Sequence, residues 1–333
     1  MNKIVKDFFK SIALLIIVSL LAVWITLYYT PNPLFTIANL IPIEANLTKP
    51  DNYLTIEKST KVERNIVYSE QYPNSLLDIY SPIHSNDKLP VVLFVHGGGF
   101  FKGEKEMAKY FGRTISSNGY AFISINYDLV PNATVFDQVK QINDSIQFIT
   151  DNADEYSLDI DNINLAGSSA GGFLALQLLS SYHNEIYAKK IKIAPVEKIK
   201  FNSLLLYSAV YNLSEFQHYD SNFLTSYLLS KIGWGLTGER SWESDSVLGA
   251  ILNQNNYINK DFPSIFITDG NTNTFTEQAT NYSNRLEETG VFVQTLFFNS
   301  REEVGHGYQL NMHTSASKKA VKESLNFLER VNK

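Results

Sequence analysis

The sequence contains no cysteine among its 333 residues. This absence excludes disulfide bonds, thiolate catalysis, cysteine-based zinc sites and lipid attachment through cysteine. The net charge is only −6, and lysine and arginine form no recurring cluster along the chain. Because phosphate binding needs grouped basic side chains, we expect no nucleic-acid partner.

A long apolar run without any charge lies near the N-terminus, at residues 11–29. At about 1.5 Å per helical residue it would span roughly 28 Å, close to the thickness of bilayer hydrocarbon. Three lysines precede the run, whereas the stretch after it up to Lys49 carries only Glu44 as a charge. Because positive charge is retained on the cytoplasmic side, this asymmetry predicts a single-pass membrane helix with the domain on the extracytoplasmic side.

A cleaved signal peptide is the alternative interpretation of this run. Such peptides usually have an apolar core of about 7–15 residues that ends at small residues. Here the core is longer and continues into Tyr28, Tyr29 and a Pro-Asn-Pro segment. The sequence therefore favours an uncleaved anchor at residues 1–30, followed by a proline-containing linker at 31–60 and one domain at 61–333.

Short apolar segments alternate with helical patterns after about residue 60. Arg64–Ser69 and Leu76–Tyr80 indicate an antiparallel pair of strands, and Pro90–Val95 is a continuous apolar run typical of a strand buried on both faces. Strands that alternate with helices predict an α/β fold with a mainly parallel, doubly wound sheet. Further strands are predicted at 121–126, 163–166, 203–207, 264–268 and 291–298. Helices are predicted at 135–153, 277–288 and 314–331, and 167–180 is predicted to be a strand end followed by a helix.

The segment at about 213–258 interrupts this alternation. It is rich in aromatic residues, among them Trp234 and Trp242. We interpret it as a helical insertion above the sheet edge that shapes a substrate pocket. An ordinary crossover helix with a long loop is the alternative.

A Gly-x-Ser-x-Gly motif connects the strand at 163–166 to the helix that follows it. This context forms a tight turn that places the central residue, Ser169, in a strained conformation, and side chains at Gly167 and Gly171 would collide across the turn. The start of the following helix favours negative charge beside the serine. The motif predicts Ser169 as a nucleophile exposed in a cleft.

Three consecutive glycines follow the strand at 90–95. Glycines leave their backbone N–H groups bare and free to point at a ligand. With the N–H of Ala170, those of Gly98 and Gly99 are predicted to bind the oxyanion that forms when a serine attacks an ester carbonyl, and Gly97 is the alternative donor. A flexible turn is the other interpretation, and the position directly after a core strand argues against it.

His306 lies on a glycine-flanked loop between the last predicted strand and the last helix. A serine hydroxyl is a poor nucleophile unless a neighbouring imidazole accepts its proton. His306 alone among the six histidines has such a position, and we interpret His96 as a structural residue that braces the glycine loop. We therefore predict His306 as the general base for Ser169.

The motifs and their order resemble the α/β-hydrolase esterases of the hormone-sensitive-lipase and feruloyl- and acetyl-xylan-esterase type. The resemblance is carried by His96–Phe100, Gly167–Gly172 and Gly305–Tyr308, with support from Asn126–Pro131 and Leu158–Asp159. It implies an eight-stranded, mostly parallel sheet flanked by helices. It also implies short acyl esters as the usual substrates and no cofactor, and we predict no metal site.

The sequence departs from this family at the acid of the triad. The family commonly has Gly-x-x-Asp after the seventh strand, and alignment on Gly270 puts Asn273 in the place of the acid. An asparagine can orient the imidazole but cannot stabilise its protonated form by charge. We predict that Asp269 supplies the carboxylate from a shifted position, with Asn273 as the second candidate and Glu277 as the third. Capping of a turn is the alternative role for Asp269.

These patterns together predict a serine carboxylesterase that forms an acyl-enzyme with a small-molecule ester. A catalytically silent α/β-hydrolase fold used as a surface binding module is the alternative, motivated by the missing acid at position 273. A serine peptidase is disfavoured, because the short N-terminal region leaves no room for the propeller domain of the large oligopeptidases.

Overall fold

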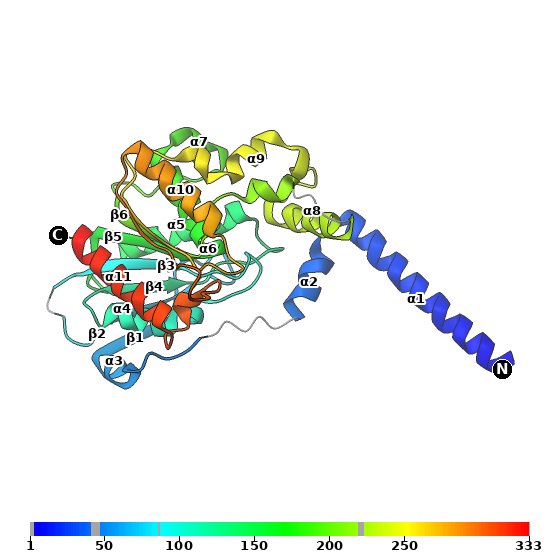
Figure 1. Cartoon of the computed structure of the whole chain (residues 1–333), viewed down its shortest axis with the longest axis horizontal. Helices are drawn as coiled ribbons and strands as arrows, with labels where there is room; N and C mark the ends of the chain where they lie inside the picture. Colours follow the sequence, from blue (N-terminus) through cyan, green and yellow to red (C-terminus); the bar gives the residue numbers. More distant parts are fainter. Residues whose placement is uncertain (1–2, 41–46, 86, 219–222, 333) are drawn as a thin grey trace.

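A mostly parallel β-sheet lies at the centre of the computed structural model, which describes residues 3–40, 47–85, 87–218 and 223–332. Within this described part the sheet has eight strands in the order β1-β2-β4-β3-β5-β6-β7-β8 (Figure 1). The strands are β1 (Thr60–Val67), β2 (Leu76–Pro82), β3 (Leu89–Val95), β4 (Ala121–Ile125), β5 (Leu158–Ser168), β6 (Phe201–Tyr207), β7 (Ser264–Thr268) and β8 (Val293–Leu296). The α-helices are α1 (Lys3–Tyr29), α2 (Asn32–Leu40), α3 (Tyr53–Ser59), α4 (Lys109–Ser116), α5 (Val135–Asp151), α6 (Ala170–His183), α7 (Glu185–Lys190), α8 (Phe223–Thr237), α9 (Ser246–Leu252), α10 (Thr276–Thr289) and α11 (Ser315–Val331). Short 3-10 helices are η1 (Lys105–Ala108), η2 (Leu213–His218), η3 (Trp242–Ser244), η4 (Gln254–Tyr257) and η5 (Tyr308–Leu310).

The pairing of the strands confirms the predicted α/β-hydrolase fold. β1 pairs antiparallel with β2 and β2 with β4, whereas the other neighbouring strands run parallel. β5 is longer than predicted and begins at Leu158, because Leu89 and Pro90 of β3 extend the pairing before a register shift. β8 is shorter than predicted, because it is an edge strand whose pairing with β7 covers only Val293 to Leu296.

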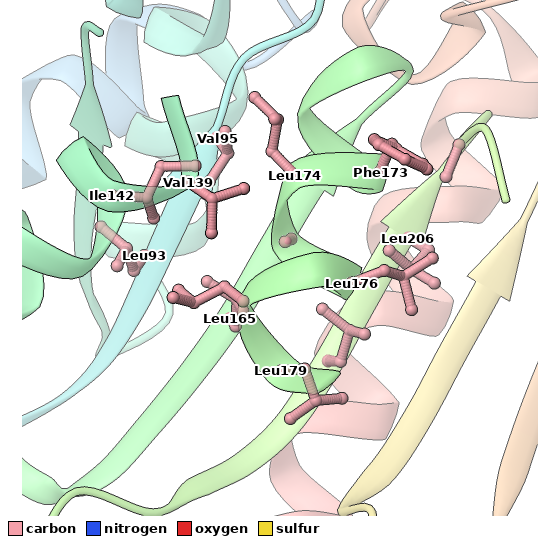
Figure 2. Packing of buried hydrophobic residues seen from close by; sticks show 14 of the residues in the cluster. Leu93, Val95, Val139, Ile142, Leu165, Phe173, Leu174, Leu176, Leu179 and Leu206 are labelled. Atoms are coloured by element: carbon pink, nitrogen blue, oxygen red, sulfur yellow. The ribbon is translucent and has the colours of Figure 1, made fainter. Parts of the chain in front are cut away.

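Helices cover both faces of the sheet because alternate side chains of its strands point to opposite sides. Leu93 and Val95 of β3 belong to the core on the face covered by α5 and α6 (Figure 2). Phe94 points to the other face, where its ring lies 6.0 Å from that of Phe111 in α4. Phe327 of α11 belongs to this second core. Burial on both sides explains why β3 reads as a continuous apolar run.

The described residues of the segment at 213–258 are mainly helical and lie between β6 and β7. They form α8 and α9 with three 3-10 helices around them, rather than one crossover helix with a long loop. Trp242 is buried, and its indole N–H donates to the carbonyl of Ser230 at 2.9 Å, which holds η3 against α8. Residues 219–222 of this segment lie outside the described residues.

Residues 31–60, predicted as a linker, contain the helices α2 and α3. α2 packs on the domain through Phe35, which is 1% exposed and whose ring lies 5.6 Å from that of Phe101. The sequence pattern did not indicate these helices because their contacts are with residues distant in the chain. Residues 41–46 lie outside the described part, and the division of the chain into anchor, linker and domain stays a prediction.

α1 extends away from the domain, and α8 lies beside its C-terminal end (Figure 1). From Val5 to Tyr29 it is long and apolar enough to cross a membrane, and its side chains are almost all exposed. Signal sequences share this length and composition. The structure therefore confirms the helix, while a membrane crossing stays a prediction.

A buried ion pair links β2 to η1 and is expected to matter for stability. Lys105 is 1% exposed, and its ammonium nitrogen lies 3.0 Å from the carboxylate of the fully buried Asp78 in β2. Replacing Asp78 with asparagine should lower the free energy of unfolding by about 3 kcal/mol, because it leaves a buried ammonium with less compensating charge. The free energy of unfolding is measured by urea titration of the full chain in detergent micelles, with circular dichroism as the signal.

Asp154→Asn is the matched control, because its partner Lys88 and Asp154 itself are exposed, with 54% and 93% of their side-chain areas accessible. Exposed pairs are screened by water, so no resolvable shift of the unfolding midpoint is expected. Equal shifts for the two variants would contradict the importance of the buried pair.

Candidate active site

Ser169 lies at the turn between β5 and α6, in a backbone conformation that L-amino acids rarely adopt (φ 54°, ψ −122°). The turn is tight enough to exclude side chains on both sides of the serine. A Cβ atom at Gly167 would come within 2.4 Å of the carbonyl oxygen of Gly171, and one at Gly171 within 2.2 Å of the carbonyl oxygen of Val95. The glycine spacing read from the sequence therefore has a steric cause in the structure.

His306 comes from the loop after β8, and its imidazole faces the serine. The Nε2 atom lies 2.8 Å from the Ser169 Oγ, within hydrogen-bond distance. The ring also makes an edge-to-face contact with Phe275, with centroids 5.4 Å apart. The structure thus brings together the predicted nucleophile and the predicted base, which are 137 residues apart in the chain.

The other ring nitrogen of His306 faces a threonine rather than a carboxylate. Nδ1 lies 2.9 Å from the hydroxyl oxygen of Thr274, and that hydroxyl lies 2.5 Å from Oδ1 of Asp269. An ionised carboxylate only accepts, so Thr274 donates to Asp269 and accepts from Nδ1–H of His306. This order leaves Nε2 as the acceptor for the Ser169 hydroxyl, which is the tautomer that a general base requires.

Burial and neighbouring charge shift the pKa values of Asp269 and His306 in opposite directions. Burial raises the pKa of Asp269, which is fully inaccessible, and hydrogen bonds from Thr274 and its neighbours oppose this rise only in part. Desolvation by the surrounding protein lowers the pKa of His306, although part of the residue is open to solvent, and the nearby Asp269 carboxylate counters the shift. A lowered pKa keeps the imidazole neutral, and therefore able to accept a proton, at neutral pH.

The two other candidates for the acid position, Asn273 and Glu277, lie at the surface. Asn273 is exposed, in a left-handed conformation (φ 51°), and Glu277 is exposed on the first turn of α10. Among the hydrogen bonds of the described residues, neither reaches His306. Sequence reasoning missed Thr274, because nothing distinguishes it in the sequence from the other hydroxyl and amide residues around it.

The glycine loop after β3 packs directly against the serine. A Cβ at Gly97 would lie 2.9 Å from the Cβ of Ser169, and Gly98 and Gly99 have φ angles of 122° and 63°. Among the described residues, none accepts a hydrogen bond from the backbone N–H of Gly98, Gly99 or Ala170. These N–H groups are thus available to a ligand at Ser169.

His96 lies at the start of this loop and is held in place by its contacts with Tyr127. It is 1% exposed and stacks on Tyr127, with ring centroids 4.3 Å apart, and the Tyr127 hydroxyl donates to the His96 carbonyl at 2.7 Å. Burial lowers the pKa of His96 to about 4, so its ring is neutral. A neutral, stacked imidazole away from Ser169 fits the predicted bracing role.

Two cavities meet at Ser169. The larger, of about 760 Å³, lies between the glycine loop and the His306 loop, and Glu302 and Glu303 stand at its edge. The smaller, of about 240 Å³, lies under α8 and is lined almost entirely by apolar side chains. Within the described residues, no group of three or more His, Asp or Glu side chains is arranged to hold a metal ion.

Comparisons with known proteins place the chain in a family. The sequence model of the BD-FAE family matches residues 77–288. A probable isoprenylcysteine alpha-carbonyl methylesterase from Arabidopsis thaliana is 37% identical over 117 residues, which cover 35% of this chain and 24% of that protein. An acetyl esterase from Salmonella typhi is 31% identical over 114 residues, which cover 34% of this chain and 35% of that protein. The matches thus span about a quarter to a third of the length of these two relatives.

Solved structures resemble the chain over a longer stretch. Esterase B from Lactobacillus rhamnosis superposes with a TM-score of 0.73 at 20% identity and covers 86% of this chain and 88% of its own. At this level of identity the likeness concerns the fold.

Proposed function

Since the chain belongs to the BD-FAE family and has the α/β-hydrolase fold, we propose that it hydrolyses carboxylic esters, with Ser169 as nucleophile and His306 as general base. The observation that carries this proposal is the 2.8 Å contact between Ser169 Oγ and His306 Nε2, beside backbone N–H groups that have no acceptor among the described residues. Relatives named as a methylesterase and an acetyl esterase support ester hydrolysis as the reaction.

The first half of the reaction forms an acyl-enzyme. Ser169 Oγ attacks the ester carbonyl carbon while His306 Nε2 takes the hydroxyl proton, and the N–H groups of Gly98, Gly99 and Ala170 stabilise the oxyanion. The protonated His306 then gives this proton to the alcohol oxygen, and the bond between that oxygen and the acyl carbon breaks. Asp269 stabilises the protonated imidazole through Thr274 and by its charge.

The second half returns the enzyme to its starting state. Water enters the space left by the alcohol and loses a proton to His306 as its oxygen attacks the acyl carbon. The bond to Ser169 Oγ breaks, and the serine recovers its proton from His306. The products are one carboxylic acid and one alcohol, so the reaction needs no cofactor or metal.

The alternative is a silent α/β-hydrolase fold that serves as a surface binding module. The absent acid at position 273 motivated it. The buried carboxylate of Asp269, linked to His306 through Thr274, weakens that motive.

Labelling with a fluorophosphonate distinguishes the two functions. An activated serine attacks the phosphorus and expels fluoride, so the full chain should be labelled at Ser169 while the Ser169→Ala variant stays unlabelled. His306→Ala should label far more slowly, because no base then takes the serine proton. A wild-type chain that does not react would exclude the hydrolase.

In this proposal α1 anchors the enzyme in a membrane as a single-pass helix, with the hydrolase domain on the extracytoplasmic side. Support comes from the exposed apolar stretch Val5–Tyr29 and from the three lysines close to the N-terminus. A small-molecule ester is the substrate class in this proposal.

A further inference from the structure

The smaller cavity is shaped for an apolar chain that starts at Ser169. Ser169, Gly99 and Ala170 border it at one end, so an acyl group bound to the serine enters it directly. Its volume of about 240 Å³ exceeds the about 150 Å³ of an engineered protein cavity that binds benzene. It therefore has room for an acyl chain of several carbons rather than for an acetyl group alone.

α8 forms one wall of this cavity, and two glycines leave its backbone without side-chain cover. A Cβ at Gly233 would overlap the ring of Trp242, which lines the cavity. A Cβ at Gly235 would come within 2.1 Å of the ring of Phe35 on α2. α8 is thus packed between an aromatic ring of the insertion and one from the segment that follows α1.

α2 joins this wall to the membrane helix. It begins three residues after α1 ends, at Asn32 and Tyr29 respectively, and its Ile37 and Leu40 are 53% and 79% exposed. α8 lies beside the end of α1 (Figure 1). The cavity wall therefore stands where the chain leaves the proposed bilayer.

Aromatic and cationic side chains surround this junction. The guanidinium of Arg240, just after α8, lies 4.2 Å from the ring centroid of Tyr28 at the end of α1. Arg240 itself is exposed. Tyrosine and tryptophan favour the headgroup layer of a membrane, where lysine and arginine also meet lipid phosphates.

We propose that the cavity under α8 takes the acyl chain of a membrane-resident ester, which enters from the bilayer that holds α1, past the junction of α2 and α8. The inference rests on the proposed ester hydrolysis and on the proposed anchoring of α1. The polar remainder of the substrate lies in the larger cavity, which Glu302 and Glu303 border. The substrate class is thus an amphiphilic ester with an apolar acyl chain and a polar alcohol.

The test uses the full chain reconstituted in phosphatidylcholine vesicles. Two probes are compared, p-nitrophenyl acetate, which stays in water, and p-nitrophenyl octanoate, which partitions into the bilayer. The wild-type chain should have the higher kcat/KM for octanoate. Phe35→Ala removes the ring behind the cavity wall and should lower the octanoate-to-acetate ratio about tenfold, in the range of a hydrophobic pocket that loses a packing contact.

Phe35 is buried, so its loss could also disturb folding, and a second variant therefore changes only exposed residues. The double substitution Ile37→Ser and Leu40→Ser changes only exposed side chains of α2 and should also lower the ratio, because α2 then sits less deeply in the interface. Ile186→Ser on α7, which is 71% exposed, is the matched control and should leave both rates unchanged.

Each outcome decides a separate claim. A wild-type preference for acetate, or a ratio that neither α2 variant alters, overturns the inference while ester hydrolysis stands. Absence of Ser169-dependent turnover of either probe overturns the proposed function itself, and the inference with it.

Discussion

Replacing Ser169 with alanine is expected to lower kcat for p-nitrophenyl butyrate by about 10⁵- to 10⁶-fold, as in other serine hydrolases that lose their nucleophile. The Oγ atom lies 2.8 Å from His306 Nε2, and no other side chain at the turn projects a hydroxyl toward that nitrogen among the described contacts. Without it no acyl-enzyme forms, and only water attack beside the oxyanion site remains. The measurement is release of p-nitrophenol by the purified full chain.

Ser168→Ala is the matched control for this variant. Ser168 is the adjacent residue, but it is buried and its hydroxyl accepts a hydrogen bond from Gln309 Nε2 at 2.7 Å. Its loss should affect kcat far less than the loss of Ser169. Comparable losses at both positions would show that the turn, and not the nucleophile, had been damaged.

Replacing Asp269 with asparagine is expected to lower kcat by about 10⁴-fold, similar to the loss of the acid in other triads. The carboxylate orients Thr274, which in turn holds Nδ1–H of His306. An amide in its place removes the charge that stabilises the protonated imidazole. Asn273→Ala and Glu277→Gln should leave kcat close to that of the wild type, because neither side chain has a hydrogen bond to His306 among the described contacts.

Substitutions at Thr274 distinguish two ways in which Asp269 can act on His306, through the Thr274 hydroxyl or directly by its charge. Thr274→Val keeps the shape but removes both hydrogen bonds and should lower kcat, whereas Thr274→Ser should restore most of the rate because it keeps the hydroxyl. A valine variant as active as the wild type would show that Asp269 acts on the imidazole by its charge alone.

The pH profile provides a second measurement for Asp269. The neutral imidazole is the active form, so kcat/KM should fall as the pH drops through the pKa of His306. Desolvation lowers the pKa of His306, which places this fall below the ordinary histidine value of about 6.5. Since the Asp269 carboxylate raises the pKa of His306, Asp269→Asn should move the fall to still lower pH. A shift to higher pH would contradict the assigned charge interaction.

The sequence alone determined the features that depend on residues close together in the chain. The apolar run of β3 reflects burial on both faces, and the glycines around Ser169 are required by a turn of a few residues. Parallel strands then bring the loops after β3, β5, β7 and β8 to one edge of the sheet. The mainly parallel sheet and the proximity of Ser169 to His306 were therefore predictable from local patterns and their order, and the resemblance to the α/β-hydrolase esterases implied eight strands.

Only the tertiary structure shows how the carboxylate of Asp269 is linked to His306. The loops after β7 and β8 meet in an isolated bridge between Thr272 and Gly305, and a Cβ at Gly270 would come within 2.1 Å of the Val304 carbonyl oxygen. This close approach sets Thr274 between Asp269 and His306.

The packing of α2 on α8 was likewise invisible in the sequence. The ring of Phe35 fits against the bare backbone of Gly235, two hundred residues later in the chain. Contacts of this kind leave no periodic pattern in either segment, because each is a match of shapes between surfaces that only the completed fold brings together.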